Sequence, residues 1–279
     1  MALITSQRIT TFYERFKDIN VTITKEIIQV TGLQTQQVHL KCGNDFWPCV
    51  IFSLSFQGAK IIANVKSGLL GKLQQVNNNV NIRFCFKHPE QAKDVTFFVP
   101  GRVQGNSPYN GSQEVSIFTL QFNRPPDDLI EIFGRVLDAN INSTKRKDER
   151  IELNADNLRK LKLLSRDSAV FIQKVPRKCI LRDVSFSGAK IIMLGVVKFL
   201  LDKEAAIRFD FEDPRESFLI NGKFVRAENV EGKKEMVALA LNFNESTIPM
   251  GYKIRLNDFI STARADNRTQ PDPAAATKK

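Results

Sequence analysis

An internal duplication constrains the fold of this chain more than any other feature. Residues 49–62 and 179–192 are identical at eight of fourteen positions, at an offset of 130. Two further pairs of segments match in the same order, with offsets that drift by a few residues: residues 82–89 with 207–214, and 118–123 with 239–244. Matches that keep their order indicate two copies of one fold, not chance similarity.

Both copies are predicted to be mostly β. Residues 80–86 and 206–211 alternate apolar and polar side chains, as half-buried strands do. Turn signals follow each of them, at residues 88–89 and 212–216. Several short strands separated by turns predict a small antiparallel barrel. The expected fold class is therefore mostly β, with two tandem antiparallel β-barrels and short flanking helices.

Helical patterns are fewer. Residues 125–137 open with prolines and acids and then space their apolar residues as a helix does, which would end the first copy. Residues 10–18 and 244–260 are further helix candidates. The end of the chain is rich in Pro, Ala and charge, which predicts a disordered tail. We therefore expect three parts: domains at residues 1–140 and 141–261, and a disordered tail at 262–279.

Composition excludes several classes of protein. The four cysteines form no CxxC pair and there are only two histidines, so no zinc-site spacing exists. We expect the cysteines to be buried apolar residues in a reducing compartment. No signal peptide is visible, and the longest apolar run, residues 194–201, is too short to span a bilayer. The chain is expected to be a cytoplasmic monomer without membrane insertion.

The positive charge of the chain is local. Of a net charge of +11, most lies in residues 141–182, where 12 Lys and Arg stand against 5 Asp and Glu. A basic cluster favours anionic partners, namely phosphates, nucleic acid or an acidic membrane. The alternative is a solvated basic face without a ligand.

Two short motifs carry the chemistry of a nucleotide site. Arg146 and Arg150 each offer a planar fork of donors that matches a phosphate, or the O6/N7 edge of guanine, and that stacks on bases. Asp183, when ionised, accepts hydrogen bonds only and suits the N1–H and N2–H donors of guanine. Ser185 adds a hydroxyl, and Gly188 lets a ligand approach the backbone. Together they predict a site for a guanine-bearing, doubly phosphorylated ligand.

Each motif also has a plainer interpretation. The two arginines fit a basic linker between the copies. Asp183 and Ser185 fit turn chemistry before the strand that Gly188 opens, since Asp and Ser favour turns. That second interpretation is compatible with ligand binding.

RxxxR followed by (D/N)xSxxG in a small β-barrel resembles the PilZ domain, a family of cyclic di-GMP receptors. Residues 222–226 are similar to the later G-x-V-x-R strand of such domains. The whole chain, with a degenerate first copy, looks like the two-domain PilZ receptors of spirochaetes, the PlzA type. The resemblance implies that the residues of both motifs bind cyclic di-GMP. It adds Lys145, which directly precedes Arg146, where the family often has a second basic residue.

The first copy departs from this pattern. Ser53 replaces the aspartate aligned with Asp183, although Ser55 and Gly58 remain. No RxxxR occurs upstream, in residues 11–18. We therefore expect this copy to play a structural or partner-binding role and not to bind the nucleotide by itself.

The function expected from the sequence is that of a non-enzymatic cyclic di-GMP receptor without a cofactor. Both histidines, His39 and His88, lie in the copy that lacks the motif, and no arrangement typical of an activated nucleophile is visible. Binding would rearrange the junction of the copies and signal to an unidentified downstream protein. The alternatives are a nucleic-acid-binding protein that uses residues 141–182, and a scaffold with a vestigial site.

Overall fold

The computed structural model describes residues 2–87, 94–233 and 235–269, which fall into two compact units. Unit 1 ends at Leu137 and unit 2 begins at Asp138. The turn signal at residues 88–89 lies outside the described residues.

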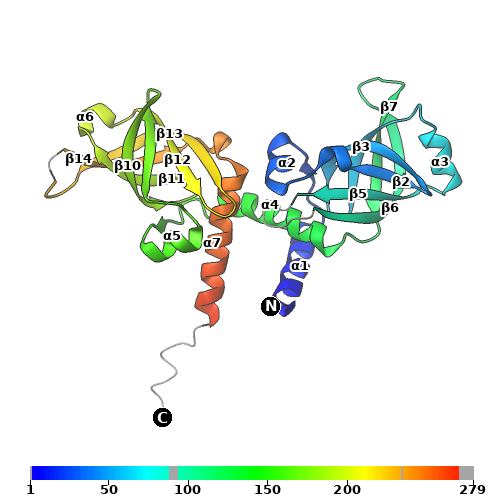
Figure 1. Ribbon diagram of the computed structural model, residues 1–279, viewed down its shortest axis with the longest axis horizontal. Helices are drawn as coiled ribbons and strands as arrows, with labels where there is room; N and C mark the ends of the chain where they lie inside the picture. Colours follow the sequence, from blue (N-terminus) through cyan, green and yellow to red (C-terminus); the bar gives the residue numbers. More distant parts are fainter. Residues whose placement is uncertain (1, 88–93, 234, 270–279) are drawn as a thin grey trace, which may run out of the picture. The chain divides into compact units, whose positions relative to one another are not determined.

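Unit 1 is a closed antiparallel barrel of six strands. They follow one another in the order β3-β2-β5-β6-β7-β4, and pairing between β3 and β4 closes the ring. A short strand, β1, adds to the outer edge of β3. Figure 1 shows α2 and α3 on opposite sides of this barrel. The elements are α1 (Ala2–Phe16), β1 (Val21–Thr22), α2 (Lys25–Thr31), β2 (His39–Cys42), β3 (Asp45–Leu54), β4 (Gly58–Asn64), α3 (Leu69–Gln75), β5 (Asn79–Phe86), β6 (Val95–Pro108) and β7 (Val115–Phe122), with a 3-10 turn at Thr35–Gln37.

Unit 2 repeats this barrel. Its ring runs β10-β9-β12-β13-β14-β11 and closes by pairing of β10 with β11, while the short β8 takes the place of β1. The elements are α4 (Asp127–Lys145, which begins in unit 1), β8 (Ile151–Glu152), α5 (Ala155–Leu161), β9 (Asp167–Ile172), β10 (Val175–Val184), β11 (Gly188–Leu194), α6 (Val197–Leu200), β12 (Glu204–Phe211), β13 (Glu216–Asn229), β14 (Met236–Phe243) and α7 (Met250–Thr269), with a 3-10 turn at Glu245–Thr247. Two closed barrels confirm the mostly β prediction.

The duplication extends to irregularities of the backbone. A bulge interrupts β3 between Ile51 and Ser53, and the same bulge interrupts β10 between Leu181 and Asp183. Such bulges bend a strand and change the direction of the following side chain. The two barrels therefore share their strand order and also this bulge, which in unit 2 sets the direction of the Asp183 side chain.

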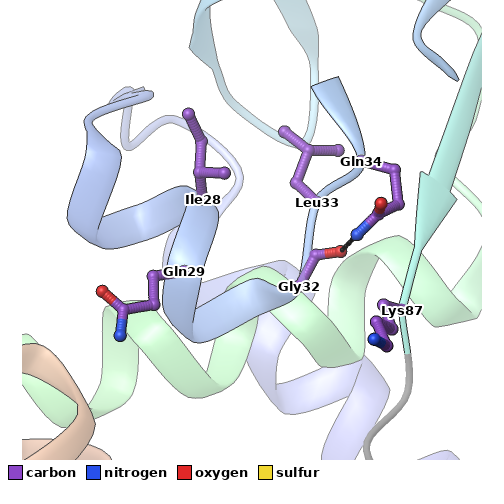
Figure 2. A pocket seen from close by; sticks show the side chains of 6 residues that line it. All are labelled: Ile28, Gln29, Gly32, Leu33, Gln34 and Lys87. Atoms are coloured by element: carbon purple, nitrogen blue, oxygen red, sulfur yellow. Dashed lines mark hydrogen bonds between the residues drawn. The ribbon is translucent and has the colours of Figure 1, made fainter. Parts of the chain in front are cut away.

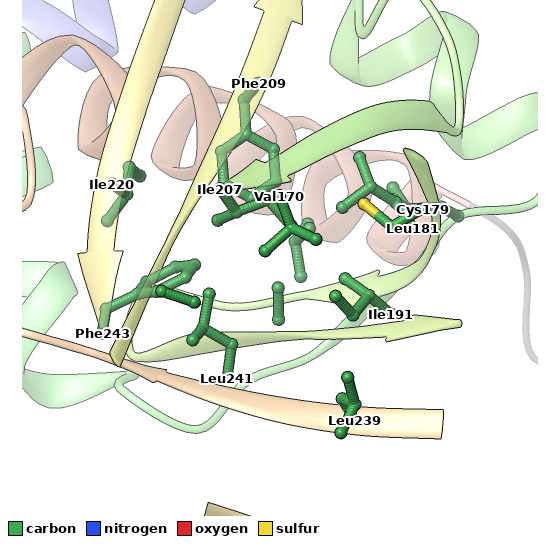
Figure 3. Close-up of a cluster of buried hydrophobic side chains, with 14 of the residues drawn as sticks. Val170, Cys179, Leu181, Ile191, Ile207, Phe209, Ile220, Leu239, Leu241 and Phe243 are labelled. Carbon is green, nitrogen blue, oxygen red and sulfur yellow. The ribbon is translucent and has the colours of Figure 1, made fainter. Parts of the chain in front are cut away.

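Each barrel is filled by inward-facing apolar side chains. In unit 2 the strands contribute alternating buried residues, and Figure 3 shows Val170, Ile191, Ile207, Phe209 and Leu239 meeting inside the barrel. Val170, Ile191, Ile207 and Leu239 are each 0% exposed. The apolar side chains that alternate along residues 206–211 thus point into this core, as predicted.

Two helices are longer than the sequence suggested. The helix expected at residues 125–137 continues to Lys145, so it ends directly before Arg146. The tail predicted to be disordered from Thr262 is helical as far as Thr269, because α7 continues through that point. Polar, charged residues do not by themselves end a helix whose first turns are packed. Residues 270–279 of the predicted tail lie outside the described residues.

Close packing of two strands explains one glycine in each copy. A Cβ on Gly188 would lie 2.4 Å from the carbonyl oxygen of Leu241, and a Cβ on Gly58 would lie 2.1 Å from that of Leu120. Since real Cβ atoms do not approach backbone that closely, only glycine permits β11 to pair with β14, and β4 with β7, at these points.

We predict that Gly58→Ala lowers the free energy of unfolding of unit 1 by about 1–3 kcal/mol, because the new methyl group forces the strands apart. Trp47, the one tryptophan of the chain, reports on this unit in urea titrations. Gly105→Ala is the control, since a Cβ at Gly105 meets nothing within 4 Å. Equal losses in the two variants would contradict the steric explanation.

Candidate functional site

The RxxxR segment, residues 146–150, leaves the end of α4 and enters β8. The backbone N–H of Arg146 still donates to the carbonyl of Asn142, at 2.8 Å, which is the last bond of the helical pattern. β8 then pairs with β10, where Glu152 lies opposite Asp183. This short strand pairing brings the end of the segment beside Asp183.

Arg150 and Asp183 form an ion pair. Nη1 of Arg150 lies 2.5 Å from Oδ1 of Asp183, and their side chains are 50% and 19% exposed. Asp183 follows the bulge in β10 and also lies opposite Lys190 of β11. The predicted guanine-reading carboxylate is therefore held by one predicted cation and is accessible from solvent.

The side chain of Arg146 is half-buried. Its Nη1 atom is fully buried and has no hydrogen-bond partner among the described residues. Buried polar groups in folded proteins are normally paired, and an unpaired charged donor is costly. Nη1 is therefore an unsatisfied donor among the described residues, and it can pair with an anionic acceptor only after a local rearrangement.

The rest of the segment is fixed by contacts from other parts of unit 2. Lys147 pairs with Glu245, Oγ of Ser187 donates to Asp148 at 3.3 Å, and Arg264 pairs with Glu149 at 2.8 Å. Lys145, the last residue of α4, is exposed. Sequence reasoning missed Ser187, Glu245 and Arg264, since no local pattern marks residues that are 39 to 115 positions distant from their partners.

Ser185 lies inside the turn that joins β10 to β11. It is 0% exposed. Its N–H donates to the carbonyl of Gly188 at 2.8 Å, and its Oγ accepts from the N–H of Gly188 at 3.1 Å. Tyr252 donates its hydroxyl to the carbonyl of Ser185 at 2.9 Å. In this conformation the hydroxyl closes the turn between β10 and β11, which is the turn interpretation of the motif.

Comparison with known proteins agrees with this architecture. Residues 7–140 match the PilZN3 domain family. The cyclic di-GMP binding protein of Treponema denticola is 43% identical over 266 residues, which cover 95% of this chain and 85% of that protein. The chain belongs to the PilZ family.

Solved structures resemble this PilZ chain more distantly. The PlzA protein of Borreliella burgdorferi in complex with cyclic di-GMP is 23% identical, with 91% of this chain and 99% of that chain covered and a TM-score of 0.41. YcgR of Escherichia coli in complex with cyclic di-GMP is 11% identical, with coverages of 87% and 90% and a TM-score of 0.30.

Unit 1 has the same turn and strand pairing as unit 2 but lacks the charged groups of the site. Ser55 donates its N–H to the carbonyl of Gly58 at 2.8 Å, as Ser185 does to Gly188. At the offset of 130, Phe16 stands in place of Arg146, Asn20 in place of Arg150, and Ser53 in place of Asp183. Phe16 is 1% exposed, so a buried ring occupies the position of the first cation.

An open pocket of about 570 Å³ lies in unit 1. None of the predicted ligand residues lines it (Figure 2); its walls are Ile28, Gln29, Gly32, Leu33, Gln34 and Lys87. The amide of Gln34 donates to the carbonyl of Gly32 at 3.1 Å at its edge. Among the described residues, its walls offer no acidic acceptor or paired arginines for a guanine nucleotide.

The cysteines and the potential metal ligands are the remaining groups of chemical interest. All four cysteines are free and buried, as predicted. Burial raises the pKa of Cys49 and Cys179 to about 12, which keeps both as unreactive thiols near neutral pH. Within the described residues no group of three His, Cys, Asp or Glu side chains is placed to hold a metal ion. Of the helices described, none is long and apolar enough to cross a membrane.

We predict that Ser185→Ala and Arg150→Ala separate structure from ligand chemistry. Ser185→Ala removes buried hydrogen bonds and lowers the free energy of unfolding by about 1–3 kcal/mol. Arg150→Ala removes a half-exposed ion pair and changes it by less than about 1 kcal/mol. Scanning calorimetry measures both; a larger loss in Arg150→Ala would show that the pair is mainly structural.

Proposed function

We propose that this chain is a cytoplasmic, non-enzymatic receptor for cyclic di-GMP that binds the nucleotide in unit 2. The observation that carries the proposal is the unpartnered, buried Nη1 of Arg146, four residues before Arg150 and its ion pair with Asp183. Membership of the PilZ family and the name of the Treponema relative support the same ligand.

Each group has a role that its geometry permits. Arg146 donates to a phosphate oxygen, which satisfies its buried Nη1. Arg150 exchanges part of its bond with Asp183 for a phosphate or a guanine edge. Asp183 then accepts the N1–H and N2–H of guanine. Lys145, exposed at the end of α4, adds a positive charge near the phosphates.

Ser185 and Gly188 contribute to this site indirectly in the proposed arrangement. Ser185 holds the turn that follows Asp183, and Gly188 keeps β11 against β14. Both residues fix the position of Asp183, and any contact with the ligand passes through the backbone of the turn.

The arrangement also explains selectivity for guanine. Adenine presents an acceptor at N1 where guanine presents a donor, so an ionised Asp183 would face a lone pair. A site built to hydrogen-bond a donor rejects the analogue that lacks it, because its own acceptor then faces another acceptor.

Signalling follows from the position of the segment in the chain. α4 holds residues of both units and ends directly before Arg146. We propose that nucleotide binding changes the conformation of residues 146–150 and thereby the orientation of the two units, which a downstream protein detects.

We predict that Arg146→Ala and Arg150→Ala each weaken cyclic di-GMP binding by about tenfold to 150-fold, since a charge-assisted hydrogen bond contributes about 1.5–3 kcal/mol. Isothermal titration calorimetry measures the affinity. Lys147→Ala is the control, because it removes the same charge from the same segment but Lys147 pairs with Glu245. Equal losses in all three variants would indicate a general effect of charge.

We predict that small-angle scattering profiles of the wild type change when cyclic di-GMP saturates it, and that those of Arg146→Ala do not change at the same concentration. Cyclic di-AMP serves as the ligand control in both proteins. A nucleotide that binds without altering the wild-type profile would contradict the proposed rearrangement and leave the binding site in place.

A further inference from the structure

A chain of buried polar side chains joins α4 to α7 within unit 2. Nδ2 of Asn142 donates to Oδ1 of Asn257 at 2.8 Å, and Nδ2 of Asn257 donates to Oδ2 of Asp138 at 3.0 Å. The three residues are 5%, 3% and 8% exposed. Burying polar groups is unfavourable unless their bonds are made, so this contact depends on its hydrogen-bond geometry.

In unit 1 the position of the asparagine pair is apolar, although the ion pair of Arg8 with Glu131 also joins α1 to α4. At the offset of 130, Phe12 of α1 corresponds to Asn142, and it is 5% exposed. Its ring lies against Gly134, where a Cβ would meet the ring at 2.2 Å. Gly134 follows Pro126 by the same number of residues as Asn257 follows Pro249. A ring packed on glycine in unit 1 is thus replaced by two hydrogen-bonded asparagines in unit 2.

The polar contact lies one helical turn from the ligand segment. Asp138, Asn142 and Arg146 are spaced four residues apart and so follow one face of the helix. The N–H of Arg146 donates to the carbonyl of Asn142 itself. α7 reaches the segment a second time through the ion pair of Arg264 with Glu149.

We propose that Asn142, Asn257 and Asp138 are positioning residues that set the orientation of Arg146 for the nucleotide. The inference rests on the proposed function for the identity of the ligand. Apolar packing is non-directional and tolerates rotation of one helix against another, whereas a chain of hydrogen bonds fixes their register. Unit 1, which has a buried phenylalanine in place of Arg146, has a ring packed on glycine in place of the asparagine pair.

The test is the double variant Asn142→Leu/Asn257→Leu, whose side chains are close in size to the originals. Hydrogen exchange of the Arg146 amide is expected to accelerate by about tenfold relative to that of Leu239 in β14, since local opening becomes easier while the barrel remains. The dissociation constant for cyclic di-GMP is expected to rise by about tenfold as Arg146 loses its fixed position. Phe12→Leu, at the matching position of unit 1, is expected to change neither quantity.

Coupling to Arg146 separates positioning from general damage. In an Arg146→Lys background the leucine substitutions should weaken binding by less than about twofold, because the geometry they disturb no longer matters. A penalty that persists in full would contradict the inference. If the double variant does not fold, Asn257→Ala replaces it in both measurements.

Different results would contradict the proposed function and the positioning role of the asparagines. A wild-type protein that shows no heat with cyclic di-GMP contradicts the proposed function, and the exchange of the Arg146 amide still tests the positioning role. A wild type that binds, with unchanged exchange and affinity in the leucine variant, contradicts the positioning role alone.

Discussion

Each barrel is closed by the pairing of two consecutive strands, β3 with β4 in unit 1 and β10 with β11 in unit 2. The turn between the two strands makes this pairing possible. In unit 2 this turn runs from Ser185 to Gly188, with reciprocal hydrogen bonds between the two residues. Gly188 then permits backbone contact with β14 that any side chain would block. Since Asp183 is the last residue but one of β10 before this turn, the interaction that closes the barrel also places the carboxylate that is proposed to read guanine.

The duplication separates what the fold requires from what the ligand requires. Both copies keep the serine, the glycine, the bulge and the short strand that pairs beside it. At the aligned positions of the charged motif residues they differ, since Phe16, Asn20 and Ser53 stand in place of Arg146, Arg150 and Asp183. A framework that is stable with either set leaves these positions free to change, so binding chemistry can be present in one copy and absent from the other.

The sequence predicted much of this because the relevant signals are local. Alternation of apolar residues in the strands and the repeat itself were sufficient for the fold class. Side-chain chemistry, the order of the two motifs and the resemblance to PilZ domains together pointed to Arg146, Arg150 and Asp183. The role of Ser185 could not be decided, since turn formation and ligand contact favour the same residue. The bond between Asn142 and Asn257 depends on packing between segments 115 residues apart, for which one sequence has no signal. The burial of Nη1 of Arg146 is likewise a property of the folded unit.

A crystal structure of the chain with cyclic di-GMP would show whether Arg146 and Asp183 hold the nucleotide in unit 2, as we propose. We expect a phosphate oxygen within hydrogen-bond distance of Nη1 of Arg146, a guanine edge on the carboxylate of Asp183, and Ser185 still buried in its turn. Nucleotide bound elsewhere, with Arg150 and Asp183 still paired and Nη1 of Arg146 unpartnered, would contradict this proposal.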